Sequence, residues 1–175
     1  YFSKLKLTQK NKKKKYDFIY IGRLSSEKNY KLIFDIAIKI KNSKILIISN
    51  DINNYNKNIK NIIYKKNISN DKIHEYLLKS KFLVLPSNYE GQSKVMLESM
   101  YFNIPVIAKN SKGINKYIIN YKNGFLFKNI DDFIEIYKSI NENKILLKNI
   151  TQNAYKKIVK NNLLHVILKK ELKLI

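Results

Sequence analysis

The chain has 175 residues, a hydrophobic fraction of 45% and a net charge of +22. This length and apolar fraction suit one domain with its own core and exclude a disordered chain. The apolar runs fall short of the roughly 18 residues that a membrane span needs, and no secretory signal is visible. The absence of cysteine excludes disulfides and thiolate metal sites. We therefore expect a cytoplasmic protein.

In chain order, the sequence predicts short apolar strands that alternate with helices. The expected segments are a linker or edge segment (1–15), a strand (17–21), a helix (29–40), a strand (44–49), a loop (51–60), a strand (61–64), a helix (70–79), a strand (82–85), a helix (93–102), a strand (105–108), a short helix (114–119), a turn into an apolar segment (125–127), a helix (131–140) and one or two terminal helices (143–175). We expect Asn70 or Asp71 to cap the helix at 70–79, and Asn129 or Asp131 to cap the helix at 131–140.

Continuous apolar strands between helices indicate an α/β fold: a Rossmann-like, doubly wound parallel sheet with helices on both faces and C-terminal helices. The chain then divides into a linker or edge segment (1–15), a Rossmann-like core (16–128) and C-terminal helices (129–175). Ligands of such sheets bind outside the carboxyl ends of the strands. The loops after Ile21 and Leu85 are therefore the expected binding loops.

The charge is carried almost entirely by lysine, since Arg23 is the one arginine among 35 basic residues. A basic chain can bind nucleic acid or an anionic membrane, or it can reflect the codon usage of an AT-rich genome. Nucleic-acid modules usually interleave arginine with aromatic residues, and this sequence has no such pattern. We therefore expect no specific nucleic-acid partner, and peripheral contact with an anionic membrane stays open.

The first candidate site follows the strand at 17–21. Gly22 lets the backbone approach a ligand, and Arg23 and Lys28 supply a planar guanidinium fork and a point charge near a helix start. This combination suits a diphosphate. The alternative is an ordinary charged surface loop.

The second candidate site follows the strand at 82–85. Glu90 and Gly91 stand in a tight loop, and the backbone N–H groups of Gln92 and Ser93 open the next helix, where an anion is favoured. Glu98 lies further along that helix, where its carboxylate can accept hydrogen bonds from a vicinal diol such as a ribose. The alternative is that both glutamates face solvent.

These residues together resemble the C-terminal, donor-binding domain of retaining glycosyltransferases of group 1 (family 4), which have a two-Rossmann-domain architecture. The resemblance runs from about Tyr16 to Phe127. It rests on Gly22-Arg23-Leu24, Glu27-Lys28-Asn29, Leu85-Pro86-Ser87, Glu90-Gly91, Glu98-Ser99-Met100, Pro105-Val106-Ile107-Ala108, Gly113 and Asn123-Gly124-Phe125-Leu126.

The resemblance implies a nucleotide-diphosphate sugar as the partner. Arg23 and Lys28 would hold its pyrophosphate, Glu98 its ribose, and Glu90 the donor sugar. The backbone of Gly91, Gln92 and Ser93 would meet the distal phosphate and sugar, and the base would lie near residues 64–68. The expected catalytic residues are Glu90, Arg23 and Lys28, for a hexosyl-type transfer to a glycan or lipid-linked acceptor in polysaccharide biosynthesis.

The sequence departs from the family at four positions, of which Ser99 in place of the usual alanine is a mild change. Lys66 and Asn103 stand where the family often has glycine, and Lys116 stands where it often has glutamate. These changes bear on local loop geometry. The two histidines, His74 and His165, lack the spacing of metal ligands, so neither a metal nor a cofactor is expected.

Two other classes of function stay open at this point. One is a basic adaptor for nucleic acid or an anionic membrane, and the other is an enzyme of the same architecture, such as a nucleotide-sugar epimerase or a phosphorylase. The acceptor site of the family lies in an N-terminal domain for which this chain has no room. We therefore expect a fragment or one half of a split enzyme, inactive alone.

Overall fold

The structure is a computed structural model that describes residues 13–51 and 59–160. Within these residues, six parallel strands form one sheet in the order β3-β2-β1-β4-β5-β6. The strands are β1 (Tyr16–Ile21), β2 (Ile45–Ile48), β3 (Ile62–Lys65), β4 (Ser80–Leu85), β5 (Val106–Lys109) and β6 (Phe125–Phe127). The predicted Rossmann-like α/β fold is confirmed. The segment 1–15 falls almost wholly outside the described residues, and the division at residue 128 stays a prediction.

The sequence predicted an apolar segment at 125–127 but did not predict that it forms strand β6. Its three residues pair in parallel with β5, so that Ile107 lies opposite Phe125. Phe125 and Phe127 are both fully buried on the same face of the sheet. A run this short carries too few residues for an apolar alternation to be recognised, and burial against the rest of the sheet makes it a strand.

The helices are α1 (Lys31–Lys39), α2 (Asn70–Leu78), α3 (Lys94–Tyr101), α4 (Ile130–Asn141) and α5 (Lys144–Lys160). Helix α1 begins two residues later than predicted because Asn29 has a φ of 47°, a left-handed conformation that a right-handed helix cannot include. The helix predicted at 114–119 is a single 3₁₀ turn, Ile114–Lys116. Its short length follows from the turn that residues 117–124 make immediately afterwards.

The helix caps correct one prediction and confirm another. Ser69, rather than Asn70 or Asp71, is the N-cap of α2, because Ser69 has extended backbone angles and Asn70 is already helical. A hydrogen bond with the Ser69 side chain lowers the pKa of Asp71 in the first turn. Asn129 caps α4 as predicted, since its Oδ1 accepts from the backbone N–H groups of Asp131 and Asp132 at 3.0 and 2.9 Å.

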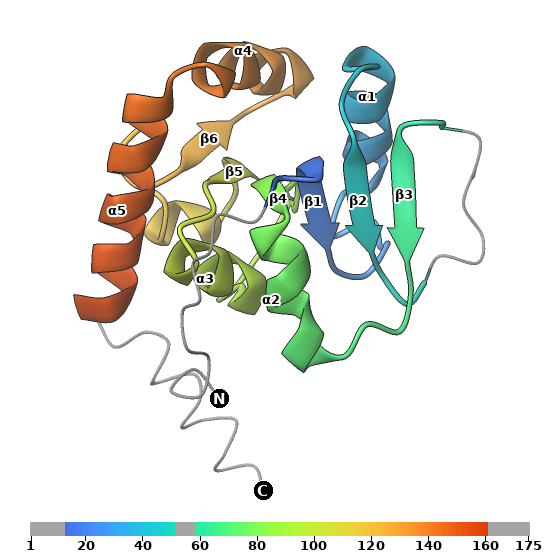
Figure 1. Ribbon diagram of the computed structural model, residues 1–175, viewed down its shortest axis with the longest axis horizontal. Helices are drawn as coiled ribbons and strands as arrows, with labels where there is room; N and C mark the ends of the chain where they lie inside the picture. The colour runs from blue at the N-terminus through green and yellow to red at the C-terminus, as the bar shows by residue number, and fades with distance from the viewer. Residues whose placement is uncertain (1–12, 52–58, 161–175) are drawn as a thin grey trace, which may run out of the picture.

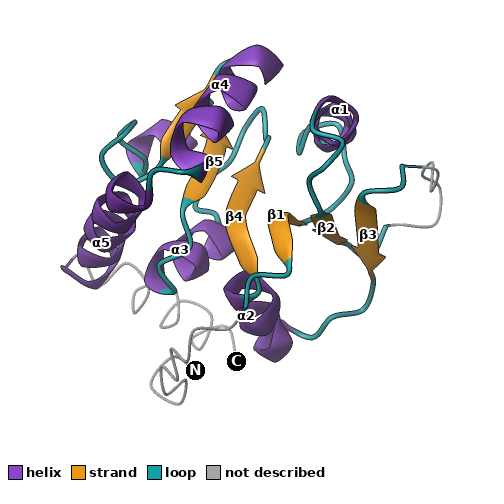
Figure 2. Ribbon diagram, turned by 45° about the horizontal axis from the view of Figure 1, so that its top comes forward, coloured by secondary structure: helices purple, strands orange, loops and turns teal. Residues whose placement is uncertain are grey.

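Alternation along each strand sends side chains to two separate cores. Ile19 and Leu83 face the layer formed by α2, α3 and the C-terminal part of α5. Phe18 and Phe82 face the layer formed by α1, α4 and the N-terminal part of α5. Figures 1 and 2 show these layers on opposite faces of the sheet, with α5 at one edge beside α3.

Several residues have purely structural surroundings. The helix predicted at 93–102 buries Met96 and Met100 in the core. The ring of His74 stacks on Phe102 with 5.9 Å between ring centroids, while His165 lies outside the described residues. None of the helices within residues 13–51 and 59–160 is long and apolar enough to cross a membrane.

Candidate functional site

The candidate site lies where the sheet changes winding direction, between the adjacent strands β1 and β4. From β1 the chain winds outward to β2 and β3, and from β4 it winds the other way to β5 and β6. The crevice at the carboxyl ends of two such strands is where doubly wound sheets bind their ligands. Both binding loops predicted from the sequence, residues 22–30 after β1 and residues 86–93 after β4, start at this point.

Hydrogen bonds join these two loops into one surface. The backbone N–H of Asn88 donates to the carbonyl of Glu27 at 3.0 Å, and the side-chain amide of Asn88 donates to the carbonyl of Ser26 at 3.4 Å. Asn29 Nδ2 donates to the carbonyl of Pro86 at 3.2 Å. The loops are therefore held in a fixed relative position, although about 60 residues of chain separate them.

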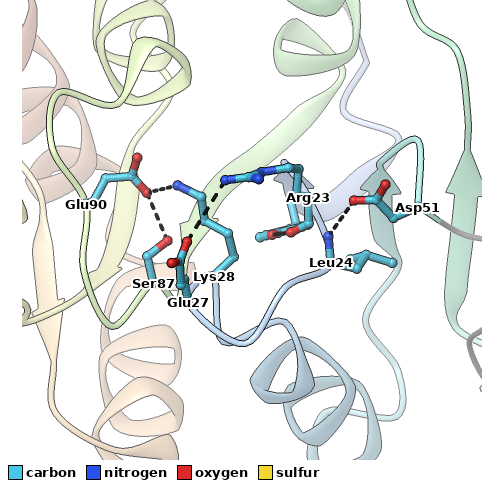
Figure 3. Close-up of polar contacts among 8 residues, drawn as sticks. Arg23, Leu24, Glu27, Lys28, Asp51, Ser87 and Glu90 are labelled. Atoms are coloured by element: carbon cyan, nitrogen blue, oxygen red, sulfur yellow. Dashed lines mark hydrogen bonds and ion pairs between the residues drawn. The ribbon is translucent and has the colours of Figure 1, made fainter.

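The centre of this surface is an ion pair between two predicted site residues. Lys28 Nζ lies 2.6 Å from Glu90 Oε2, and Ser87 Oγ donates to the same oxygen at 3.0 Å (Figure 3). The side chains of Lys28 and Glu90 are 23% and 12% exposed. The sequence predicted a role for each residue but not their direct contact.

Arg23 differs from Lys28 in being largely exposed. Its side chain is 72% accessible, and its nearest anionic partner is Glu27, with Nη2 to Oε2 at 4.0 Å. In Figure 3 the guanidinium of Arg23 and the ammonium of Lys28 extend to the same side of the loop. Two cations, one exposed and one packed, therefore face one side of the switch point.

Two residues that the sequence did not indicate shape the loop that carries Arg23. Tyr20 donates its hydroxyl to the carbonyl of Arg23 at 2.5 Å, and Asp51 Oδ2 accepts from the backbone N–H of Leu24 at 3.2 Å. Burial raises the pKa of Tyr20, and the charges of Glu90 and Asp51 raise it further, so the hydroxyl keeps its proton. A Cβ on Gly22 would lie 3.2 Å from this hydroxyl, which is a reason for glycine there. In the sequence, Tyr20 and Asp51 are marked only by their position near the carboxyl ends of strands.

The loop after β5 packs against the loop that carries Glu90. Gly113 has a φ of 100°, and a Cβ on it would lie 1.6 Å from the carbonyl oxygen of Glu90. The N–H of Glu90 also donates to the carbonyl of Lys112 at 3.4 Å. Gly113 belongs to the pattern that resembles the family, and the structure gives its physical reason: only glycine allows this close approach.

The start of α3 presents the remaining predicted residues. Gly91 and Gln92 are exposed, and a Cβ on Gly91 would meet nothing within 4 Å. Ser93 is the N-cap of α3, where its Oγ accepts from the N–H of Met96 at 3.4 Å. Helix α3 therefore begins directly after these residues, with Ser93 just outside the helix, and its role in anion binding stays a prediction.

Glu98 is held by α3 and is buried, with 6% of its surface exposed. The Glu90 side chain is 12% exposed. The alternative that both carboxylates face solvent is therefore excluded. Because a buried carboxylate is costly without hydrogen-bond donors, both positions point to polar partners.

A groove of about 420 Å³ lies elsewhere, between β6 and α4, and contains none of the predicted site residues. Some of its polar side chains have structural partners. Asn120 Oδ1 accepts from the N–H of Leu126 at 2.9 Å, and Asp132 Oδ2 accepts from the N–H of Lys128 at 3.0 Å. Within residues 13–51 and 59–160, no group of three or more histidine, aspartate or glutamate residues has the geometry to hold a metal ion.

The fold defines the class: a Rossmann-like α/β domain with two joined loops at the switch point of its sheet. Residues 3–157 match the model of the family "Glycosyl transferases group 1", and the chain belongs to this family. Family membership favours a transferase over the adaptor and epimerase alternatives. The resemblance stated from the sequence is confirmed.

Three similar proteins illustrate the relationship. The UDP-Gal:alpha-D-GlcNAc-diphosphoundecaprenol alpha-1,3-galactosyltransferase of Escherichia coli is 32% identical over 165 residues, which cover 85% of this chain and 42% of that protein. The C-terminal domain of a group 1 family protein (LpcC) from Francisella tularensis has a TM-score of 0.71 at 21% identity, covering 85% of this chain and 86% of that one. Anabaena Alr3699/HepE, solved in complex with UDP-glucose, has a TM-score of 0.71 at 14% identity, covering 89% and 49%.

These matches confirm the fold of a C-terminal glycosyltransferase domain. The chain spans less than half the length of the curated relatives that it matches, between 33% and 44%.

Proposed function

We propose that this chain is the donor-binding part of a retaining, hexosyl-type glycosyltransferase that holds a nucleotide-diphosphate sugar. The observation that carries the proposal is the joined pair of loops at the switch point, which holds Lys28 and Glu90 2.6 Å apart with Arg23 exposed beside them. A diphosphate needs cations and backbone N–H groups, and a sugar needs hydrogen-bond acceptors. This surface offers both within one site.

The proposed roles follow from position and chemistry. Arg23 binds the diphosphate through its guanidinium fork and Lys28 adds a point charge. Gly22 and Gly91 leave room for the ligand, and the backbone at Gln92 and Ser93 faces the distal phosphate and sugar. Glu98 accepts hydrogen bonds from the ribose, and Glu90 accepts them from the donor sugar.

In transfer with retention, positive charge develops at the anomeric carbon and negative charge on the departing diphosphate. Arg23 and Lys28 stabilise the leaving group as its charge grows, and contacts of Glu90 with the sugar strengthen in the same step. The three residues are therefore the proposed catalytic set. The proposal includes no metal and no further cofactor.

The partners of the whole protein are part of the proposal. The E. coli relative is named for a UDP-galactose donor and a diphosphoundecaprenol-linked acceptor, and HepE was solved with UDP-glucose. By analogy we propose a glycan or lipid-linked acceptor, polysaccharide biosynthesis, and an N-terminal domain that supplies the acceptor site. A cytoplasmic location with peripheral contact to an anionic membrane fits this acceptor and the charge of +22.

Calorimetry of the chain with a panel of UDP-, GDP- and ADP-sugars tests the proposal. We expect one nucleotide class to bind, and Arg23→Ala to weaken it by about 1.5–3 kcal/mol, the contribution of a charged hydrogen bond. Arg23→Lys should recover part of the loss because lysine is not bidentate. Lys138→Ala, which removes a positive charge from the exposed side of α4, is the matched control and should bind as the wild type does.

Binding of none of the nucleotide sugars would overturn the proposed function. Equal affinities of the wild type and Arg23→Ala would remove the role of Arg23 alone.

A further inference from the structure

The contact between Lys28 and Glu90 pairs two groups that the proposed function assigns to different parts of the donor. Lys28 is to bind phosphate and Glu90 a sugar hydroxyl, yet the two side chains lie 2.6 Å apart and neutralise each other. A phosphate that binds Lys28 must therefore compete with Glu90 or share the ammonium with it.

The surroundings decide which partner moves. Ser87, itself 1% exposed, donates to Glu90 Oε2 at 3.0 Å, and the Glu90 backbone packs on Gly113. Lys28 has a flexible stem of four carbons. Glu90 is thus the fixed member of the pair, and Lys28 is the member that can turn toward a phosphate.

Burial also decides how strong the competition is. With exposed fractions of 23% and 12%, the pair is only partly screened by water. The neighbouring pair of Arg23 and Glu27 is 4.0 Å apart with exposed fractions of 72% and 75%, so Glu27 competes little for Arg23. Lys28 is therefore the cation whose availability depends on a carboxylate.

We propose that Glu90 is a specificity-determining residue that favours the sugar-bearing donor over the free nucleoside diphosphate by competing for Lys28. A sugar hydroxyl donates to the Glu90 carboxylate and replaces the contact that Lys28 gives up. A nucleoside diphosphate has no sugar there, so it leaves a partly buried carboxylate without its cation and next to an anion, which is unfavourable. The inference rests on the proposed function, because it requires the diphosphate to bind at Lys28.

This exchange has a consequence for turnover. When the sugar has been transferred, Glu90 loses its hydroxyl donor and recaptures Lys28, which weakens the hold on the nucleoside diphosphate. Product release is then assisted by the same carboxylate that recognises the donor sugar.

The test measures affinities of the chain and of Glu90→Gln for inorganic pyrophosphate, for the tightest nucleotide sugar of the panel and for its nucleoside diphosphate. Glutamine keeps the shape and can still accept from Ser87, but it releases Lys28. We expect Glu90→Gln to bind pyrophosphate and the nucleoside diphosphate about tenfold tighter, equivalent to 1.4 kcal/mol. The nucleotide sugar should bind no tighter, so that the preference for the sugar-bearing donor is lost. Glu90→Ala should change the pyrophosphate affinity in the same direction.

A double-mutant cycle separates this exchange from a general effect of removing negative charge. In a Lys28→Ala background, Glu90→Gln should leave the affinity for pyrophosphate unchanged, because the competing cation is absent. Glu27→Gln, which removes an exposed carboxylate from the same loop, should leave it within about twofold in the wild-type background, as expected for a screened charge.

An unchanged or lower pyrophosphate affinity in Glu90→Gln would overturn the exchange, as would a gain that persists without Lys28. In both cases the binding of a nucleotide sugar to the wild type would still support the proposed function. If no nucleotide sugar binds either protein, the proposed function fails and the exchange fails with it.

Discussion

Gly91 and Gly113 lie in neighbouring loops at the carboxyl edge of the sheet, yet they have opposite surroundings. A Cβ on Gly113 would lie 1.6 Å from the carbonyl oxygen of Glu90, whereas a Cβ on Gly91 would meet nothing within 4 Å. The fold therefore explains why position 113 is a glycine and leaves open space beside Gly91. Space beside a glycine at a helix start suits the close approach of a ligand.

This contrast predicts a separation of stability from binding. Gly113→Ala should lower the free energy of unfolding by at least about 2 kcal/mol, because its φ of 100° and the clash with Glu90 both oppose a side chain. Gly91→Ala should change it by less than about 0.5 kcal/mol but weaken nucleotide-sugar binding. Urea denaturation and calorimetry on both variants check the two expectations. Normal binding by Gly91→Ala would show that the ligand does not approach this backbone.

Glu98 offers a second prediction for a single residue. Glu98→Gln should weaken both the nucleoside diphosphate and the nucleotide sugar by about 1.5–3 kcal/mol, because both carry the ribose. Inorganic pyrophosphate, which has no ribose, should bind Glu98→Gln as it binds the wild type. Equal losses for all three ligands would instead indicate that the substitution disturbs α3, and the ribose assignment would be wrong.

One departure from the family falls at a positive φ angle, and a second lies beside one. Asn103, where the family often has glycine, has a φ of 56°, and Asn67, next to Lys66, has the same value. Asparagine tolerates the left-handed conformation better than most residues. The loop geometry is thus kept with asparagine, which is a local physical reason why these changes leave the fold intact.

At the scale of elements, the site depends on three loops after β1, β4 and β5 rather than on one motif. Backbone hydrogen bonds connect Asn88 to Glu27 in the first pair of loops, and Glu90 to Lys112 in the second. Each loop alone is a short irregular segment. Together they fix the Glu90 carboxylate relative to Lys28, which is what a binding site needs.

Helix α4 has a side-chain cap that can be tested separately from the site. Asn129→Ala removes the acceptor for two backbone N–H groups and should cost about 1 kcal/mol of stability, seen as a lower Tm. Asn129→Asp should retain most of the stability because aspartate caps equally well. Asn141→Ala, at the exposed end of α4, is the matched control. A Tm of Asn129→Ala equal to that of the control would show that the cap contributes nothing.

At the scale of the whole molecule, the charge of +22 is the dominant property. The sequence has 13 acidic residues against 35 basic ones, so its carboxylates are too few to neutralise most of the basic side chains. An unbalanced charge of this kind attracts polyanions of any sequence through counterion release.

We therefore predict weak, sequence-independent binding to duplex DNA that disappears when salt is raised from low to moderate concentration. Fluorescence anisotropy with two unrelated duplexes at several salt concentrations measures this. A sequence-selective, nanomolar complex at physiological salt would contradict the expectation. Salt-sensitive binding to anionic vesicles is a separate outcome, and it would fit a transferase that acts on a lipid-linked acceptor.

The fold class, the first five strands, the main helices and most residues of the candidate site were predictable from the sequence alone. These depend on local properties: uninterrupted apolar runs, helical spacing, and rare glycines and charges at the ends of strands. The family resemblance had the same origin, since its motifs are short segments in a fixed order. The cap at Asn129 was predictable because capping involves neighbours in the chain.

Only the tertiary structure decided which of these residues touch. Strand β6 exists because it pairs with β5, and Glu98 is buried because of the elements packed around α3. The Lys28–Glu90 pair joins side chains 62 residues apart, and Gly113 contacts a loop that follows a different strand. Contacts between distant segments depend on how the strands are ordered in the sheet, and no local pattern in the sequence records that order.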